Sequence, residues 1–113
     1  MQELTRTECA QWLLAQERIL ILTHRKPDGD TVGSAAALCL ALRQAGKAAW
    51  VLDNPEFTPL LLPLVEGLVK DAPQEGDALV AVDVAADTML PKVYSQLKDC
   101  IDLRIDHHGS GRE

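Results

Sequence analysis

The sequence lacks several patterns that would assign the protein to a common functional class. Its three cysteines form no Cys-x-x-Cys pair and give no support for thiol catalysis, so we interpret them as small buried residues in a reducing compartment. No G-x-G-x-x-G follows the first apolar run, which disfavours a dinucleotide-binding module. The amino-terminal residues show no signal-peptide pattern, and the longest apolar stretch, Val32–Leu42, is too short to span a bilayer. We therefore expect a cytoplasmic protein without membrane contact.

The chain also lacks an excess of positive charge. Its formal net charge of −6 argues against a generally basic surface for nucleic acid, although a local nucleotide site stays open. Its 113 residues, of which 47% are hydrophobic, suffice for the core of one small domain.

Apolar runs alternate with segments of helical pattern along the whole chain. This alternation predicts an α/β fold: a parallel, Rossmann-like, doubly wound sheet with helices on both faces. The expected strands are 19–23, 48–52, 78–83 and 101–106. The expected helices are 6–17, a helix capped by Asp30 or Thr31 and running through Ala45, a short one near 60–68, and one from Asp87 or Thr88 toward Leu97.

Local signals refine this outline. Thr5 and Glu8 match a capping box, and Gly46 stands where a helix C-terminus favours glycine. Gly29 lies in a predicted turn and is expected to take a positive φ. The helix ending at Ala45 is apolar nearly all round, so we expect it to be buried. Trp50 is interpreted as a core residue.

Residues able to bind metal follow three of the four predicted strands. The first strand leads into His24, Asp28 and Asp30, the third ends at Asp83, and the fourth ends at Asp106, followed by His107 and His108. Parallel strands bring their carboxyl ends to one edge, where open α/β sheets build their sites. Carboxylates and imidazoles without thiolates favour Mn²⁺ or Mg²⁺, and their number suits two ions about 3.5–4 Å apart.

Each of these residues has a simpler explanation when taken alone. Asp28 or Asp30 is an ordinary turn or cap residue, and a single histidine after a strand is commonly only polar surface. The metal interpretation depends on all seven residues standing at strand ends together. Arg25 is a weaker candidate, for a phosphate contact, and a solvent-exposed charge is the favoured explanation for it.

The three segments resemble the motifs of the DHH phosphoesterase superfamily. His24-x-x-Pro-Asp28-Gly-Asp30-x-x-Gly-Ser, the later strand-terminal Asp83 and Asp106-His107-His108 occur in the family's order and cover nearly the whole chain. The first motif begins with His, as in the nanoRNase/pAp-phosphatase branch.

The resemblance implies a role for each residue. His24 and Asp28 would bind one Mn²⁺, Asp30 and His107 the other, and Asp83 would bridge the two; Mg²⁺ or Co²⁺ would be substitutes. Asp106 would orient the site, and His108 would face the substrate phosphate or the attacking water, so these two are the catalytic candidates.

The resemblance also implies an incomplete domain. Residues 1–113 correspond to the amino-terminal portion of the DHH domain, and the carboxyl-terminal DHHA1 domain that binds substrate in the family is not in the sequence. We expect this length of chain to catalyse poorly by itself. The open edge beyond the last strand favours self-association, with a homodimer as its simplest form.

The implied function is hydrolysis of short single-stranded oligonucleotides or of 3'-phosphoadenosine 5'-phosphate (pAp) by a metal-activated water. Two alternatives remain open at this point. One is exopolyphosphatase or pyrophosphatase chemistry on phosphoanhydrides, and the other is a metal-binding role without catalysis.

The clustered carboxylates predict that manganese stabilises the protein, because like charges repel until a cation neutralises them. Thermal unfolding with and without millimolar Mn²⁺ measures this, and we expect a higher melting temperature with the metal. An unchanged melting temperature would contradict the metal site.

Overall fold

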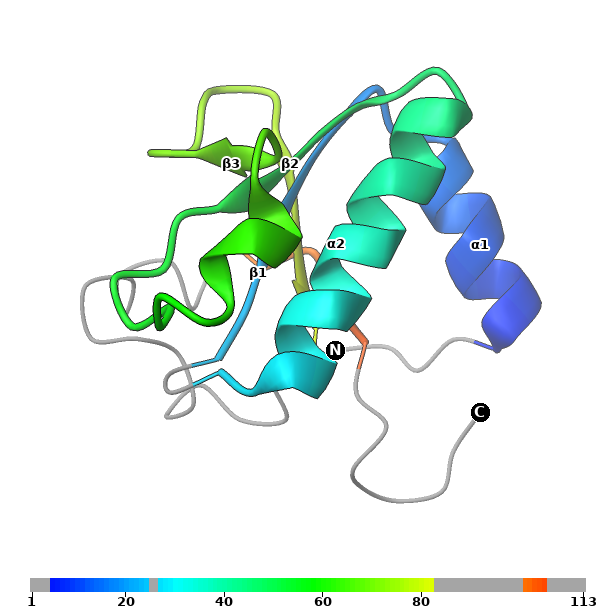
Figure 1. Ribbon diagram of the computed structural model, residues 1–113. Coiled ribbons are helices and arrows are strands. Elements are labelled where there is room, and N and C mark those ends of the chain that lie inside the picture. Colours follow the sequence, from blue (N-terminus) through cyan, green and yellow to red (C-terminus); the bar gives the residue numbers. More distant parts are fainter. Residues whose placement is uncertain (1–4, 25–26, 83–100, 106–113) are drawn as a thin grey trace.

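The structure, a computed structural model, describes residues 5–24, 27–82 and 101–105. The helices are α1 (Arg6–Leu14), α2 (Gly29–Gln44) and the short 3-10 helix η1 (Leu62–Val65). The strands are β1 (Arg18–Leu22), β2 (Ala48–Leu52), β3 (Val69–Lys70), β4 (Ala78–Val82) and β5 (Leu103–Ile105). From α1 to β3, helices and strands alternate (Figure 1), and β4 follows β3 through a loop. None of the described helices is both long and apolar enough to cross a membrane.

The strands form one parallel sheet in the order β3-β2-β1-β4-β5. This confirms the predicted parallel α/β fold. The four expected strands are present, and β3 is an addition because two residues are too few to show a pattern in the sequence. Because every strand pair is parallel, the carboxyl ends of the strands lie at the same edge of the sheet, and α2 begins at this edge, at the bottom of Figure 1.

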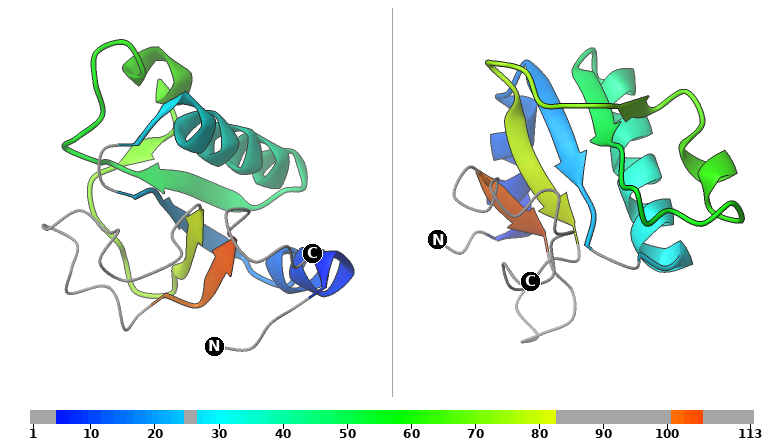
Figure 2. Two further views of the ribbon diagram at one scale, coloured as in Figure 1. Left: turned by 90° about the horizontal axis from the view of Figure 1, so that it is seen from below. Right: turned by 90° about the vertical axis from the view of Figure 1, so that its left-hand side faces the viewer.

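Both long helices of the described chain pack on the same face of the sheet (Figure 2). On that face Leu13 of α1 and Val32 and Cys39 of α2 join strand residues such as Ile21 and Val80 in one buried cluster. A second cluster, on the opposite face, consists of Leu20, Leu22, Leu52, Leu79 and Ala81 with Ile101 packed against it. The helix expected from Asp87 or Thr88 toward Leu97 lies outside the described residues.

At the helix ends, the structure confirms two of the capping signals predicted from the sequence. Thr5 and Glu8 form the predicted capping box, with Thr5 N–H donating to Glu8 Oε1 at 2.9 Å and Glu8 N–H to Thr5 Oγ1 at 3.1 Å. Gly46 ends α2 with φ 88°, and Lys47 N–H donates to the Leu42 carbonyl in a Schellman motif. The predicted burial of α2 on all sides is wrong, since Leu40 is 54% exposed.

Arg43 of α2 lies across the edge of β2 where β3 is absent. Its Nε donates to the Ala49 carbonyl at 2.8 Å and its Nη1 to the Gly67 carbonyl at 3.3 Å. The guanidinium also stacks on Trp50, 4.4 Å from the ring centroid. Trp50 is 36% exposed, so its interpretation as a core residue is wrong.

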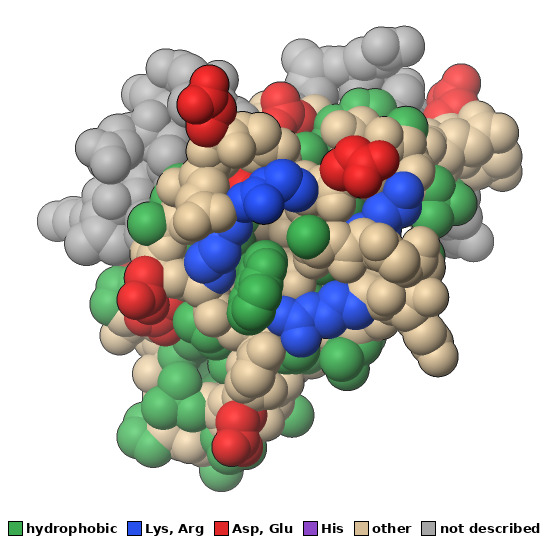
Figure 3. Space-filling view, turned by 90° about the horizontal axis from the view of Figure 1, so that it is seen from above, with side chains coloured by type: hydrophobic (Ala, Val, Ile, Leu, Met, Phe, Trp, Pro, Cys, Tyr) green, Lys and Arg blue, Asp and Glu red, His purple; other side chains and the backbone are tan. Residues whose placement is uncertain are grey.

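The buried carboxylate of Asp77 binds several groups at the amino edge of the sheet. Figure 3 shows the fold from the side of this edge. The Asp77 side chain is only 2% exposed and accepts hydrogen bonds from Arg18 Nε, at 3.1 Å, and Lys70 Nζ, at 2.8 Å. Gln74 N–H donates to the same carboxylate at 2.8 Å. Burial alone would raise the pKa of Asp77, but the hydrogen bonds and positive charges outweigh it and lower the pKa below its ordinary value.

This network predicts a pH-dependent effect of Asp77→Asn. Because the folded-state pKa is lowered, the carboxylate stabilises the fold above its unfolded-state pKa and loses this effect as the pH falls through the folded-state value. At pH 7 we expect the variant to lose about 1–3 kcal/mol of unfolding free energy, the typical range for hydrogen bonds to charged groups. In urea titrations the difference from wild type should close below about pH 4. A difference independent of pH would contradict the charge-based explanation.

Candidate metal centre at the carboxyl edge of the sheet

His24 lies between the end of β1 at Leu22 and the start of α2 at Gly29. Its side chain is half-buried, and its Nε2 is 2.8 Å from Oγ1 of Thr31, a fully buried residue of α2. Metal-binding histidines commonly hold their second ring nitrogen in such a contact, which fixes the orientation of the ring. The ring of His24 is therefore oriented by the helix that follows it.

Asp28 is the N-cap of α2. Its backbone is extended, and its Oδ1 accepts from Thr31 N–H at 2.9 Å. Hydrogen bonds from the amide and then the hydroxyl of Thr31 lower the pKa of Asp28, and the charge of His24 adds to this effect. The carboxyl group is thus kept as the anion, the form that binds a metal. Through one threonine, the structure connects two residues that were predicted to bind the same ion.

The position of the cap corrects two expectations from the sequence. Asp30 and Thr31 were the predicted caps, but both lie inside the first turn of α2. Gly29 is the first helical residue and is not among the described glycines with positive φ. An Asp in the cap position satisfies a free N–H of the first turn, so the helix begins two or three residues earlier than expected.

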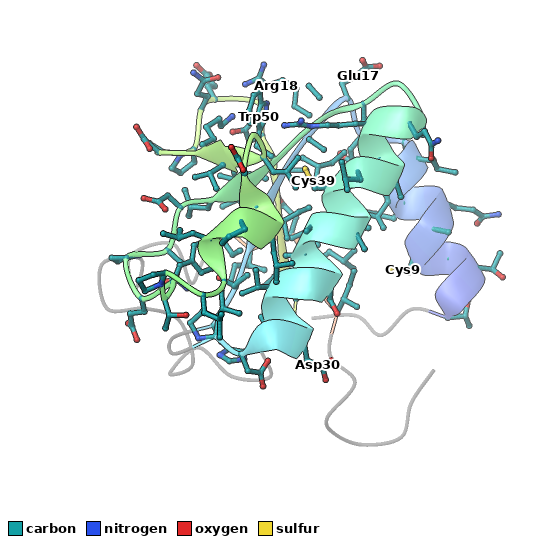
Figure 4. The ribbon with its side chains drawn as sticks, viewed as in Figure 1. Cys9, Glu17, Arg18, Asp30, Cys39 and Trp50 are labelled. Carbon is teal, nitrogen blue, oxygen red and sulfur yellow. The ribbon has the colours of Figure 1, made fainter. Side chains whose placement is uncertain are left out.

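Asp30 is exposed in the first turn of α2, at the carboxyl edge of the sheet. Figure 4 shows it at the opposite end of the fold from Glu17, Arg18 and Trp50. Negative charge is favourable at this end of a helix, because the unpaired N–H groups carry partial positive charge. The same position leaves the carboxylate open to solvent and to a cation.

The remaining predicted site residues lie outside the described part of the chain. They are Arg25, Asp83, Asp106, His107 and His108. Val82 and Ile105, which precede two of these segments, pair with each other where β4 and β5 end. Among residues 5–24, 27–82 and 101–105 alone, no three His, Cys, Asp or Glu side chains are grouped so as to hold a metal.

One residue that the sequence analysis did not single out, Asn54, contacts the described site. Asn54, which follows β2, is buried and donates from Nδ2 to Thr23 Oγ1 at 2.9 Å and to the His24 carbonyl at 3.0 Å. The sequence does contain a weak signal for a turn at this position, since an Asn two residues past a buried strand is a candidate for a turn. Its contacts across the sheet carry no sequence signal.

A shallow cavity of about 460 Å³ lies elsewhere, beside β3. Asp53, Glu66 and Asp71 contribute to its wall, together with apolar side chains, but none of the predicted site residues does. The candidate site therefore follows from the strand ends and the start of α2, not from this cavity.

The donor types of the described site residues suit a hard divalent cation, although these residues alone are not grouped so as to hold one. His24, Asp28 and Asp30 offer one imidazole and two carboxylates from a single strand-turn-helix unit. Oxygen ligands with imidazole, and no thiolate, are the donors that Mn²⁺ and Mg²⁺ accept.

Comparison with known proteins adds two findings. Residues 18–113 match the family described as "DHH family, N-terminal domain". Over 96 residues, 81% of the chain, the sequence is 40% identical to the bifunctional oligoribonuclease and PAP phosphatase NrnA of Thermus thermophilus. The matched segment spans only 28% of the length of that curated relative.

Two variants of Asp28 separate its capping role from its charge. Asp28→Ala removes the acceptor for Thr31 N–H and should lower the unfolding free energy by about 1 kcal/mol in the absence of metal. Asp28→Asn keeps an oxygen in the same place and should remain within a few tenths of a kcal/mol of wild type. Urea unfolding in the presence of a chelator measures both. If Asn destabilises as much as Ala, the charge and not the cap bond supports the helix.

Proposed function

The chain belongs to the DHH family, and on this premise we propose that it acts as a metal-dependent phosphoesterase. The observation that carries the proposal is the double contact of Thr31, whose hydroxyl meets His24 and whose amide meets Asp28. This contact holds an imidazole and a carboxylate at the carboxyl edge, where parallel α/β sheets bind their ligands.

The proposed site would hold two Mn²⁺ ions. His24 and Asp28 would bind the first, Asp30 and His107 would bind the second, and Asp83 would be shared between them. The covalent connection of Asp83 to Val82 supports its place in the site, because β4 lies next to β1 and ends at the same edge. The same reasoning supports His107, since it follows β5 by two residues.

When bound, the two ions would supply an acidified water as nucleophile and would neutralise charge on the phosphate oxygens. The protein's own groups hold and orient the reactants. Asp106 orients the ligands, and His108 faces the substrate phosphate or the attacking water. In the reaction, the water oxygen bonds to phosphorus, the ester P–O bond breaks, and the leaving oxygen receives a proton.

The proposed substrates are short oligonucleotides and pAp. The activities named for the Thermus relative support this choice, as they are those of an oligoribonuclease and a PAP phosphatase. We place the activity in the cytoplasm. In support, Cys39 is fully buried and Cys9 partly buried, as expected of unpaired cysteines in a reducing compartment.

An assay of three substrates tests the proposal. Full-length protein, of the length of the Thermus relative, is expected when loaded with manganese to release phosphate from pAp or nucleotides from short oligoribonucleotides above the level seen with a chelator, whereas residues 1–113 by themselves are expected to be much less active. Hydrolysis of polyphosphate or pyrophosphate alone would indicate the phosphoanhydride alternative. Manganese binding without hydrolysis of any substrate would indicate the non-catalytic alternative.

Asp83→Ala tests the two-ion arrangement. As the proposed bridge, Asp83 should affect both ions, so in full-length protein we expect the variant to lose hydrolysis while its circular dichroism spectrum remains that of wild type. Arg104→Ala, in β5, is the matched control and should keep wild-type turnover. Wild-type turnover in Asp83→Ala would remove the two-metal mechanism.

A further inference from the structure

The side chain of Asn54 connects the segments that follow β1 and β2, beyond the point where the backbones of the two strands pair. The paired residues of these strands end at Ile21 and Val51. Counting three residues further along each chain places Asn54 opposite His24. At this point the side chain of Asn54 supplies the contact between the two segments, through its hydrogen bond to the His24 carbonyl at 3.0 Å.

The amide of Asn54 has a hydrogen-bond partner for each of its polar atoms. Its Nδ2 donates to Thr23 Oγ1 and to the His24 carbonyl, and its Oδ1 accepts from Glu56 N–H at 2.9 Å. Asn54 is only 2% exposed. A buried amide with complete partners is rigid, and each bond lost would leave a desolvated polar group.

The bond to the carbonyl fixes the peptide that carries the His24 ring. His24 lies two residues beyond the last residue of β1, so the β-ladder does not hold it. Asn54 holds its backbone from the side of β2, and Thr31 holds its ring from α2. The two contacts together restrict both the backbone of His24 and the ring at the end of its side chain.

We propose that Asn54 is a positioning residue that sets the imidazole of His24 for metal binding. This inference rests on the proposed function, in which His24 is a metal ligand. Asn54 acts through the His24 backbone and not as a ligand. Outer contacts of this kind typically change metal affinity by about 10–100-fold when they are removed.

Two substitutions remove the donation by different means. Asn54→Ser keeps an oxygen near Glu56 N–H but is too short to reach the His24 carbonyl. Asn54→Leu has the same branching at Cγ, a larger volume and no polar atom, so it carries the test if the serine variant does not fold. We avoid Asn54→Asp, because a new carboxylate would attract cations by itself.

Asp77→Asn is the matched control. Asp77 is another buried polar side chain with several partners, but it lies at the opposite edge of the sheet. Its loss should destabilise the fold without reaching His24. A purely structural role of Asn54 would therefore give the same pattern of results as Asp77→Asn.

The first measurement is manganese affinity, by calorimetric titration of folded protein. We expect both Asn54 variants to bind Mn²⁺ about 10–100-fold more weakly than wild type, and Asp77→Asn to bind as wild type does. Wild-type affinity in a folded Asn54 variant would overturn the proposal. An equal loss of affinity in Asp77→Asn would also overturn it, because the effect would then follow from general stability.

The second measurement needs no metal and separates this inference from the proposed function. In protein labelled with ¹⁵N-histidine, the Nε2 signal of His24, assigned with His24→Gln, reports the contact with Thr31. We expect this signal to shift in the Asn54 variants and to stay in place in Asp77→Asn. If wild-type protein binds no manganese, the proposed function fails. The positioning of His24 by Asn54 is overturned separately, by a His24 signal that does not shift in the Asn54 variants.

Discussion

The common direction of the five strands is the constraint on which the candidate site depends. Parallel pairing from β3 to β5 places every carboxyl end at one edge of the sheet. It also requires a crossover between neighbouring strands, and α2 is the crossover from β1 to β2. The start of α2 is therefore at the same edge as the end of β1. The short segment between them, from Thr23 to Asp28, holds both a strand-end histidine and a helix-capping carboxylate.

The two edges of the sheet use their polar residues differently. At the amino edge, Asp77 is buried against Lys70 and Arg18, and the charges balance within the protein. At the carboxyl edge, Asp28 and Asp30 are exposed, while the buried groups, Thr31 and Asn54, are neutral. A carboxylate balanced by neighbouring cations stabilises a fold, whereas exposed carboxylates on a neutral support are the arrangement that the proposed metal site requires.

Much of the fold could be predicted from local patterns. The apolar run of β2 and the capping box of α1 appear where the sequence indicates them, because both depend on residues close together in the chain. The structure differs where distant contacts decide. Trp50 has a core-like sequence environment, but Arg43 of another element covers it from the edge of the sheet. For the candidate site, His24, Asp28 and Asp30 were predicted from their spacing, whereas Asn54 was not, because its partners lie 30 and 31 residues away.

Arg43 also has a consequence for the behaviour of the protein in concentrated solution. The unpaired side of a β-strand offers carbonyl groups on which another chain can grow as an added strand, the first step toward fibrils. The Ala49 carbonyl of β2 already accepts hydrogen bonds from Arg43 Nε and Cys39 Sγ. The charged guanidinium therefore lies where the backbone of an added strand would have to bind. An aggregating strand would have to displace a charged group from both a carbonyl and an aromatic ring. The residue that completes the edge of β2 therefore also protects it from templated growth.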